Sequence, residues 1–323
     1  MVRPTLLLSF SAKSFHGRFY ATIREEEWGN TMKTYEKIYQ ILWEAHDFVS
    51  GQDLADQLDV SRTAIWKSMK TLESKGLVIE PIKNRGYRLL LGDLLLPDEI
   101  TSATGLKVYL NETSASTQED AKEGIKKGQP SPAIYLAPNQ RSARGRFSRP
   151  FFSPESGGIY MSLHLQPNLP YDQAPAYTLM VASSIVKAIS RLAGIDCQIK
   201  WVNDIYLGQK KLAGILTEAI SSIETGLITD VIIGIGLNFL VPEFPEDLQD
   251  KATSLFTKQA PISRNQLIAE IWNIFQNTPE RDLIKVYKEK SLVLDKRVTF
   301  VENQLSYTGL ATDITDSGQL VVR

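Results

Sequence analysis

The segment Val231–Leu240, which reads VIIGIGLNFL, is the most strand-like part of this chain. Its alternation places isoleucine and leucine side chains on one face of a strand, and the other face carries Gly234, Gly236 and Asn238. Glycines weaken a buried strand unless another group approaches the backbone there. The segment therefore predicts either a flat floor beneath a planar ligand or the tight packing of a helix on the glycines.

A basic stretch, Pro138–Phe152, is the second constraint. Four arginines fall within nine residues: Arg141, Arg144, Arg146 and Arg149. No acidic residue occurs from 124 to 154. Arginine presents forked, permanently charged donors that match phosphate and carboxylate oxygens, and the small residues between them let the backbone approach a ligand. The stretch predicts a lid over an anionic ligand, and a solvated basic loop is the alternative.

Length and composition bound the remaining possibilities. At 323 residues the chain can hold two or three domains, and a net charge of −1 confines any nucleic-acid binding to a local patch. Cys197 is the only cysteine, so no intramolecular disulfide can form. We read it as a small, partly buried hydrophobe in a reducing compartment and expect a cytoplasmic protein. The three histidines are far apart, so no zinc site is expected. No apolar run approaches the roughly 18 residues of a membrane span, so no membrane partner is expected.

Residues 1–31 differ from the rest of the chain because they are basic and poor in acids. A transit peptide is one interpretation of that pattern. We favour an upstream read-through or a disordered arm, with Met32 as an ordinary start, and treat 1–31 as an extension.

Residues 32–92 follow a helix, helix, turn, helix, hairpin pattern. Ser50 and Ser61 are placed to cap the second and third helices, and Gly76 is placed to end the third. Between Ser61 and Arg88 there are seven Lys or Arg residues against two acids. This pattern predicts a winged helix-turn-helix domain on DNA. The predicted DNA-binding residues are Ser61, Arg62, Thr63, Trp66, Lys67, Lys70, Lys83 and Arg85. The alternative is a protein-interaction module with a solvated cationic face.

Beyond a linker at 92–97, residues 98–290 predict a mixed α/β domain. A polar run from Asn111 to Gln118 leads into a helix, where its hydroxyls either cap the helix or bind an anion. In the hairpin of Gln198–Ala219, Lys211 begins an otherwise apolar strand, which is unusual unless the lysine has a partner or faces solvent at an edge. Residues 291–323 are short strands that predict a small β-barrel.

Three separated stretches resemble biotin protein ligases: the loop QRSARGRFSRPFFS, the hairpin KWVNDIYLGQKKLAGIL and the strand IGIGLN. With the winged helix-turn-helix in front, residues 32–323 resemble the bifunctional form, a biotin protein ligase that is also the biotin operon repressor. The resemblance implies an α/β multidomain fold with a class II synthetase-like catalytic domain at 98–290 and an SH3-like barrel at 291–323.

The resemblance also implies a two-step reaction. Biotin and MgATP give biotinyl-5′-AMP and pyrophosphate, and the adenylate then acylates one lysine of the biotin carboxyl carrier protein of a carboxylase such as acetyl-CoA carboxylase. ATP, with Mg²⁺ as its substrate complex, and biotin are thus the expected ligands, without a protein-bound metal. A homodimer loaded with biotinyl-AMP would bind operator DNA.

Site residues follow from the resemblance position by position. It implies catalytic roles for Lys211, Arg144 and Arg146. The implied biotin site comprises Ser116, Thr117, Gln118, Gln140, Arg144, Gly145, Arg146 and Lys211. The implied ATP and adenylate site comprises Phe151, Lys200, Asn203, Gly214, Asn238 and Ser254. This sequence departs from the family at four positions: Ala143 and Ser148 replace glycines, Phe151 replaces tryptophan and Gln118 replaces asparagine.

Two other functions compete with this one. The altered loop is consistent with a ligand-sensing transcription factor whose synthetase-like domain binds ligand without catalysis. A lipoate-type acyl ligase would share the fold, although the DNA-binding head and the arginine loop argue against it.

Overall fold

The computed structural model describes residues 32–45, 47–302 and 305–323. The extension predicted at 1–31 lies outside the described residues. Within the described ranges, no helix combines the length and apolar character needed to cross a bilayer.

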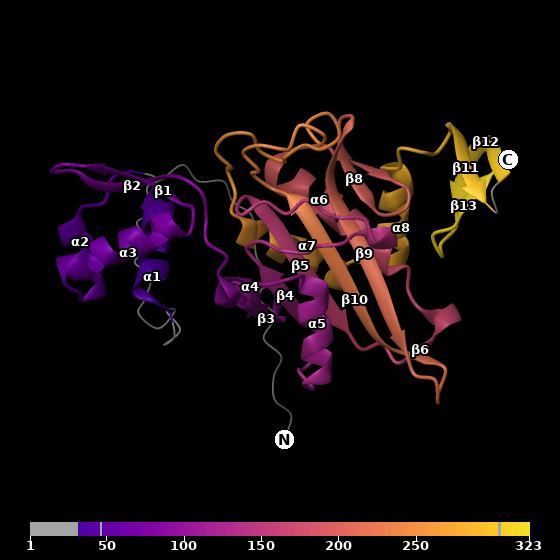
Figure 1. The fold of residues 1–323 in the computed structure, drawn as a ribbon, viewed down its shortest axis with the longest axis horizontal. Helices are drawn as coiled ribbons and strands as arrows, with labels where there is room; N and C mark the ends of the chain where they lie inside the picture. The colour runs from indigo at the N-terminus through magenta and orange to yellow at the C-terminus, as the bar shows by residue number, and fades with distance from the viewer. Residues whose placement is uncertain (1–31, 46, 303–304) are drawn as a thin grey trace, which may run out of the picture. The chain divides into compact units, whose positions relative to one another are not determined.

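The first domain has three helices and a hairpin, as predicted (Figure 1). The side chains of Ser50 and Ser61 accept hydrogen bonds from the backbone N–H groups of Asp53 and Ala64, so both serines cap their helices. The buried core comprises one stripe from each helix, namely Ile38, Leu42, Leu54, Ala55, Ile65, Met69 and Leu72. The elements are α1 (Thr34–Ala45), α2 (Gly51–Leu58), α3 (Arg62–Ser74), β1 (Val78–Ile82) and β2 (Gly86–Leu91).

The central domain is built on one mixed sheet with the strand order β3-β4-β5-β10-β9-β8-β7. Strands β3 and β4 are parallel, and the other pairs along this path are antiparallel. A short strand, β6, also pairs with β10. The strands are β3 (Lys107–Leu110), β4 (Ala133–Ala137), β5 (Gly158–Leu165), β6 (Leu169–Pro170), β7 (Gln198–Lys200), β8 (Asp204–Leu207), β9 (Lys210–Ser221) and β10 (Leu227–Asn238).

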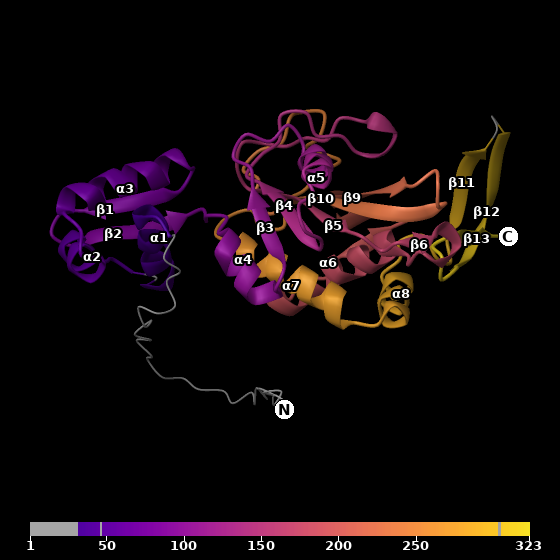
Figure 2. The ribbon, with the colours of Figure 1, turned by 90° about the horizontal axis from the view of Figure 1, so that it is seen from below.

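Helices lie on both faces of this sheet (Figure 2). Helices α6, α7 and α8 lie on one side and α5 lies on the other. The apolar residues Ile233, Ile235 and Leu237 of β10 are buried in the same cluster as residues of α6 and α7, so the glycines of β10 face the opposite side, towards α5. The predicted alternation of β10 is therefore confirmed. The helices are α4 (Pro97–Thr104), α5 (Thr117–Lys126), α6 (Tyr177–Ala193), α7 (Arg264–Asn277) and α8 (Glu280–Glu289).

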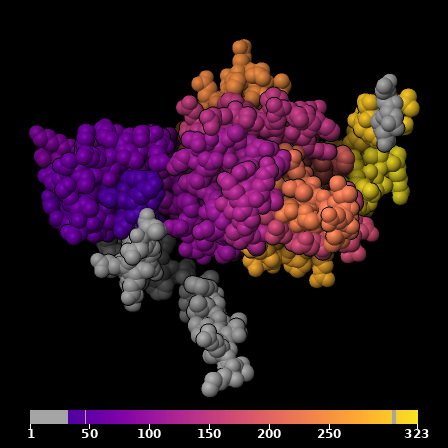
Figure 3. Space-filling model, turned by 60° about the horizontal axis from the view of Figure 1, so that its bottom comes forward, coloured from indigo at the N-terminus to yellow at the C-terminus, as the bar shows by residue number. Residues whose placement is uncertain are grey.

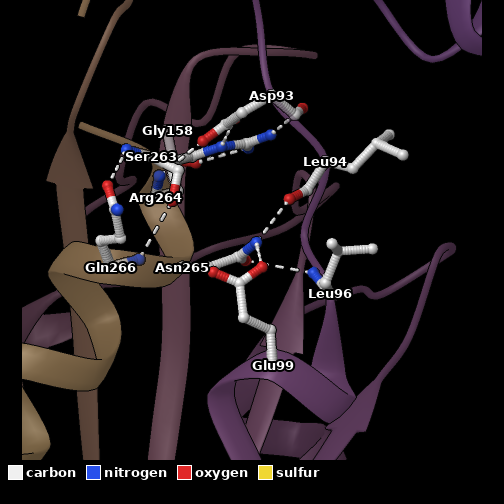
Figure 4. Close-up of polar contacts among 9 residues, drawn as sticks. All are labelled: Asp93, Leu94, Leu96, Glu99, Gly158, Ser263, Arg264, Asn265 and Gln266. Atoms are coloured by element: carbon white, nitrogen blue, oxygen red, sulfur yellow. Dashed lines mark hydrogen bonds and ion pairs between the residues drawn. The ribbon is translucent and has the colours of Figure 1, made fainter. Parts of the chain in front are cut away.

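The stretch between the first two domains is held by buried polar side chains at the start of α7 (Figure 4). Arg264 donates from Nε to the Asp93 carboxylate and from Nη1 to the Gly158 carbonyl, 3.1 Å away. Asn265 accepts from the Leu96 N–H at 3.1 Å and donates to the Leu94 carbonyl at 2.9 Å. Residues 93–96 are thus fixed by hydrogen bonds and do not form a flexible linker.

Neighbouring leucines of this stretch belong to different cores. Leu94 and Leu96 are buried in the helix-turn-helix cluster, whereas Leu95 is buried in the cluster of the central domain. The extended backbone makes this possible because successive side chains point to opposite sides.

The C-terminal residues form a three-stranded antiparallel sheet of β11 (Arg297–Glu302), β12 (Leu305–Ile314) and β13 (Leu320–Val322). Among the residues that are described here, these strands do not close into a barrel, so the SH3-like barrel stays a prediction. The indole N–H of Trp201 donates to the Gly318 carbonyl at 2.9 Å, which ties this sheet to the β7–β8 turn.

Candidate active site

Four segments that are distant in sequence enclose one cavity of about 340 Å³. They are the start of α5, the arginine loop, the β8–β9 hairpin and the glycine face of β10. This volume lies within the range of small-molecule sites. Most predicted site residues line the cavity, namely Ser116, Thr117, Gln118, Gln140, Arg144, Gly145, Arg146, Phe151, Asn203, Lys211 and Gly214.

Hydroxyls at the start of α5 form part of the cavity lining. Ser116 occupies the N-cap position, yet its side chain makes no capping hydrogen bond, so its hydroxyl can serve a ligand. The backbone N–H of Thr117 donates to Gln140 Oε1 at 2.8 Å. Thr117 Oγ1 lies 2.8 Å from Ser162 Oγ. Of the two uses predicted for this polar run, capping by the Ser116 side chain is not observed.

The arginine loop is a short hairpin over the cavity. Its backbone closes through the Gly145 N–H on the Arg149 carbonyl at 2.9 Å and the Phe151 N–H on the Ala143 carbonyl at 3.0 Å. Arg141 points away from the cavity and donates to the Thr113 carbonyl at 2.7 Å. In the part of the chain that is described, the arginines of this loop form no ion pair, so their charge is not neutralised by the protein.

The loop departs from the conformations that most side chains prefer. Phe147 and Ser148 have φ of 57° and 56°, in the left-handed region. Ser148 is one of the positions where the resemblance implies glycine, and its φ explains that preference. Ala143, the other such position, does not have a positive φ.

Lys211 points from β9 into the cavity, where its ammonium lies 2.7 Å from the Asp204 carboxylate. It therefore has a partner and is not a free edge lysine. Its neighbour Lys210 donates to the Gln249 carbonyl at 2.6 Å. Asp204 also lines the cavity, and our reading of the sequence missed it. One feature of the sequence could have identified Asp204: it is an acid in the predicted hairpin, on the strand opposite a lysine that needed a partner.

The glycines of the site make room for protein side chains. A Cβ at Gly234 would lie 2.9 Å from Gln118 Oε1, and a Cβ at Gly236 would lie 2.5 Å from the ring of Phe151. Both glycines also line the cavity. The close approach predicted from the strand pattern is thus observed, and it is made by Gln118 of a packed helix and by Phe151 of the loop.

Three predicted adenylate residues lie outside the cavity lining. Lys200 is exposed and lies over the ring of Tyr206, 5.3 Å from its centroid. Asn238 donates to the Thr253 carbonyl at 3.1 Å, and Ser254 donates to the Asn238 carbonyl at 3.2 Å. Asn238 and Ser254 are buried and join β10 to the following loop, so their contact with an adenylate stays a prediction.

The predicted DNA-binding residues lie at α3 and on the wing, which is the hairpin of β1 and β2. Arg62, Thr63, Trp66 and Lys83 line one hollow between these elements, and Trp66 is 55% exposed. Lys67 is exposed and, among the described residues, forms no ion pair. The remaining predicted residues have local partners, namely Ser61 with the Ala64 N–H, Lys70 with Glu73, and Arg85 with Phe48 and Asp47.

The fold and the site define the class: a helix-turn-helix domain joined to an α/β domain with a cavity lined by cations. Residues 110–238 match the model of the biotin/lipoate A/B protein ligase family. Residues 35–88 match a helix-turn-helix domain.

The names of curated relatives combine a ligase and a repressor. The chain is 38% identical over 218 residues to the bifunctional ligase/repressor BirA of Bacillus subtilis (strain 168), over 65% of this chain and 66% of that protein. This match spans just under two thirds of the relative's length. The chain is 27% identical over 233 residues to the bifunctional ligase/repressor BirA of Escherichia coli (strain K12), over 69% of this chain and 70% of that protein.

Solved structures share the fold of the central domain. The biotin protein ligase from Aquifex aeolicus in complex with biotin and ATP matches with a TM-score of 0.56 and 25% identity, over 67% of this chain and 90% of that chain. The apo structure of the same ligase matches with a TM-score of 0.55 and 22% identity, over 67% and 91% of the two chains.

Proposed function

We propose that this protein is a biotin ligase and a transcriptional repressor. The ligase activity forms biotinyl-5′-AMP from biotin and ATP and transfers biotin to a lysine of a carrier protein. Loading with biotinyl-AMP favours binding of the helix-turn-helix domain to operator DNA. The proposal is supported by the match of residues 110–238 to the biotin/lipoate A/B protein ligase family model, by the match of residues 35–88 to a helix-turn-helix domain, and by the names of the relatives.

One observation carries the proposal: cations and hydroxyls line a single cavity. Arg144, Arg146 and Lys211 line it together with Ser116 and Thr117. Biotin has the matching polarity, because a neutral ureido ring lies at one end and a carboxylate at the other. In this arrangement the ureido ring faces the hydroxyls, and the carboxylate lies beside Lys211 and the arginines.

In the first step a carboxylate oxygen of biotin attacks the α-phosphorus of ATP. An O–P bond forms, the bond from the α-phosphorus to the bridging oxygen breaks, and pyrophosphate leaves with that electron pair. Both reactants are anions, so the barrier depends on fixed positive charge around them. Lys211, held by Asp204, and the arginines of the loop supply that charge.

In the second step a neutral lysine amine of the carrier attacks the acyl carbon of biotinyl-AMP. The new amide C–N bond forms as the C–O bond of the mixed anhydride breaks. AMP leaves with the electron pair of that bond, and the amine nitrogen loses one proton to solvent. Mg²⁺ enters with ATP, whose phosphate oxygens hold it.

The first test is biotin-dependent release of pyrophosphate from MgATP, measured without carrier. We expect release of pyrophosphate with biotin, and weak competition by lipoate at equal concentration. If the protein uses lipoate as well as biotin or better, it is a lipoate ligase and not a biotin ligase. Tight binding of biotin without pyrophosphate release would instead favour the ligand-sensing repressor.

A further inference from the structure

Phe147 is an exposed aromatic side chain at the tip of the arginine loop. The side chain is 80% exposed, although phenylalanine is among the residues most often buried in folded proteins. The loop, drawn in magenta, projects from the face of the sheet that carries α5 (Figure 2), and the magenta segment of the chain that contains it lies on the surface (Figure 3). Phe147 belongs to the cavity lining while most of its side chain is exposed, so it lies at the rim.

The backbone at the loop tip has an unfavourable conformation. Phe147 has φ of 57° and ψ of 33°, and Ser148 follows with φ of 56°. The left-handed region brings Cβ close to the following carbonyl oxygen, so a residue with a bulky side chain rarely adopts it. Such outliers cluster at binding sites. In this loop the outlier coincides with a phenyl ring that lies at the surface instead of in the cavity.

Two guanidinium groups flank the phenyl ring. The Cζ atoms of Arg146 and Arg149 lie 5.2 Å and 5.9 Å from the ring centroid, within the range of cation–π attraction. Phe147 belongs to none of the apolar clusters that the described residues form. The loop tip thus presents an apolar surface bordered by positive charge, and its complement is an apolar side chain with carboxylates nearby.

The apolar contact inside the cavity is made by a different residue, Phe151. Its ring packs against Gly236, where a Cβ would lie 2.5 Å from it, and it lies edge-on to Tyr160 with the ring centroids 6.5 Å apart. The loop therefore has one aromatic side chain that faces the sheet and one that faces outward. The inner ring is accessible to a small ligand, whereas the outer ring is accessible to a macromolecule that approaches the cavity.

The carrier protein is the macromolecule that must approach this cavity. In the proposed transfer step, its lysine amine reaches the acyl carbon of biotinyl-AMP. A lysine side chain has a stem of four carbons, so the carrier backbone comes close to the rim when the amine enters the cavity. The residues beside the acceptor lysine then lie within reach of the loop tip.

We propose that Phe147 docks the carrier protein, and that its ring packs on an apolar side chain next to the acceptor lysine. The carrier face that fits combines this side chain with carboxylates for the flanking arginines. This inference rests on the proposed function, since it takes the carrier as the partner. Phe147 then selects the carrier in the second step and takes no part in the first.

The test separates the two steps on the full chain. Biotin-dependent pyrophosphate release measures the first step, and transfer from preformed biotinyl-AMP to an isolated biotin carboxyl carrier domain measures the second. We expect Phe147→Ser to leave pyrophosphate release unchanged and to raise the KM for the carrier about tenfold at the same kcat, because truncating one apolar anchor weakens an interface by roughly that factor. Phe147→Leu keeps an apolar side chain and should retain most of the affinity.

A small acceptor shows whether the effect belongs to the carrier surface. Hydroxylamine replaces the carrier by a small amine, and formation of biotin hydroxamate should be equal in Phe147→Ser and wild type. Tyr171→Ser is the matched control, because Tyr171 is 82% exposed but lies outside the cavity lining. This control should leave the KM for the carrier unchanged.

Three results would overturn the inference while the wild type still labels the carrier and the proposed function stands. The first is a carrier KM that is the same in Phe147→Ser and wild type. The second is an equal slowing of hydroxamate formation, which would place the ring on the adenylate. The third is weaker self-association of Phe147→Ser in sedimentation with an unchanged carrier KM, which would assign the ring to an interface between two copies. Absence of carrier labelling by the wild type would overturn both proposals.

Discussion

At the scale of single residues, Lys211 is the side chain on which the proposed chemistry depends most. It extends from β9 into the cavity and is oriented by Asp204, 2.7 Å away. A charge that is held in place before the reaction stabilises developing negative charge without a reorganisation cost.

We predict that Lys211→Ala slows adenylation by two orders of magnitude or more, since one preorganised charge is worth roughly 3 kcal/mol. The measurement is biotin-dependent pyrophosphate release under saturating ATP. Lys210→Ala is the matched control, because Lys210 bonds to the Gln249 carbonyl outside the cavity lining and should leave the rate unchanged. Near-normal adenylation by Lys211→Ala would show that the lysine is not needed for this step.

The left-handed backbone at Ser148 gives a second prediction. Ser148→Gly relieves a positive φ of 56° and should stabilise the protein by about 1 kcal/mol. Ala143→Gly is the control: its φ is not positive, so the substitution should give no gain. Denaturant unfolding measures both free energies. A loss of stability in Ser148→Gly would show that the serine side chain contributes more than its backbone costs.

The predictability of the site differs from residue to residue. The arginine loop and Lys211 were found because their charge stood out against apolar or acid-free surroundings. Asp204 was missed because local sequence does not say which acid of the hairpin faces the lysine. The hydrogen bond from Gln118 to Glu218 could not be predicted either, since it joins residues 100 positions apart in the chain.

At the scale of elements, helix α3 and the wing carry the proposed DNA contact. Both serine caps and the buried stripe of α3 were predicted, because capping and helical periodicity are local properties. The closed C-terminal barrel was expected, and three strands are described instead. Alternating short strands indicate pairing, whereas closure depends on register between distant strands, which sequence spacing does not determine.

We predict that Lys67→Ala weakens operator binding and reduces its salt dependence by about one counterion, while leaving ligation intact. Lys67 is exposed on α3 and forms no ion pair with the residues that the structure describes. Binding is measured by titration of labelled operator at several salt concentrations. Lys285→Ala, at an exposed position on α8, is the control. An unchanged salt slope in Lys67→Ala would place the DNA contact elsewhere.

At the scale of the whole molecule, residues 93–96 connect the helix-turn-helix domain to the proposed catalytic domain. Arg264 binds the Asp93 carboxylate and the carbonyl of Gly158, and Gly158 pairs with Asn238 at the end of β10. Sequence patterns marked this stretch as a linker because it falls between two domains. They could not show its anchoring, since Arg264 lies 171 positions away from Asp93.

We predict that Asp93→Ala lowers the free energy of unfolding by about 3–5 kcal/mol, because it leaves the guanidinium of Arg264 buried and unpaired. The double variant Asp93→Leu with Arg264→Met removes both charges and should recover much of that loss. Equilibrium unfolding of the full chain is the measurement. A small effect of Asp93→Ala alone would mean that water replaces the carboxylate.

We propose above that this cavity activates biotin and that the protein transfers it to a lysine of a carrier. This is tested by the mass of an isolated biotin carboxyl carrier domain after incubation with the protein, biotin and MgATP. We expect one biotin per carrier on one lysine, and loss of labelling when Arg144 and Arg146 are both replaced by alanine. An unlabelled carrier at high concentration of the wild-type protein would contradict the proposed ligase activity.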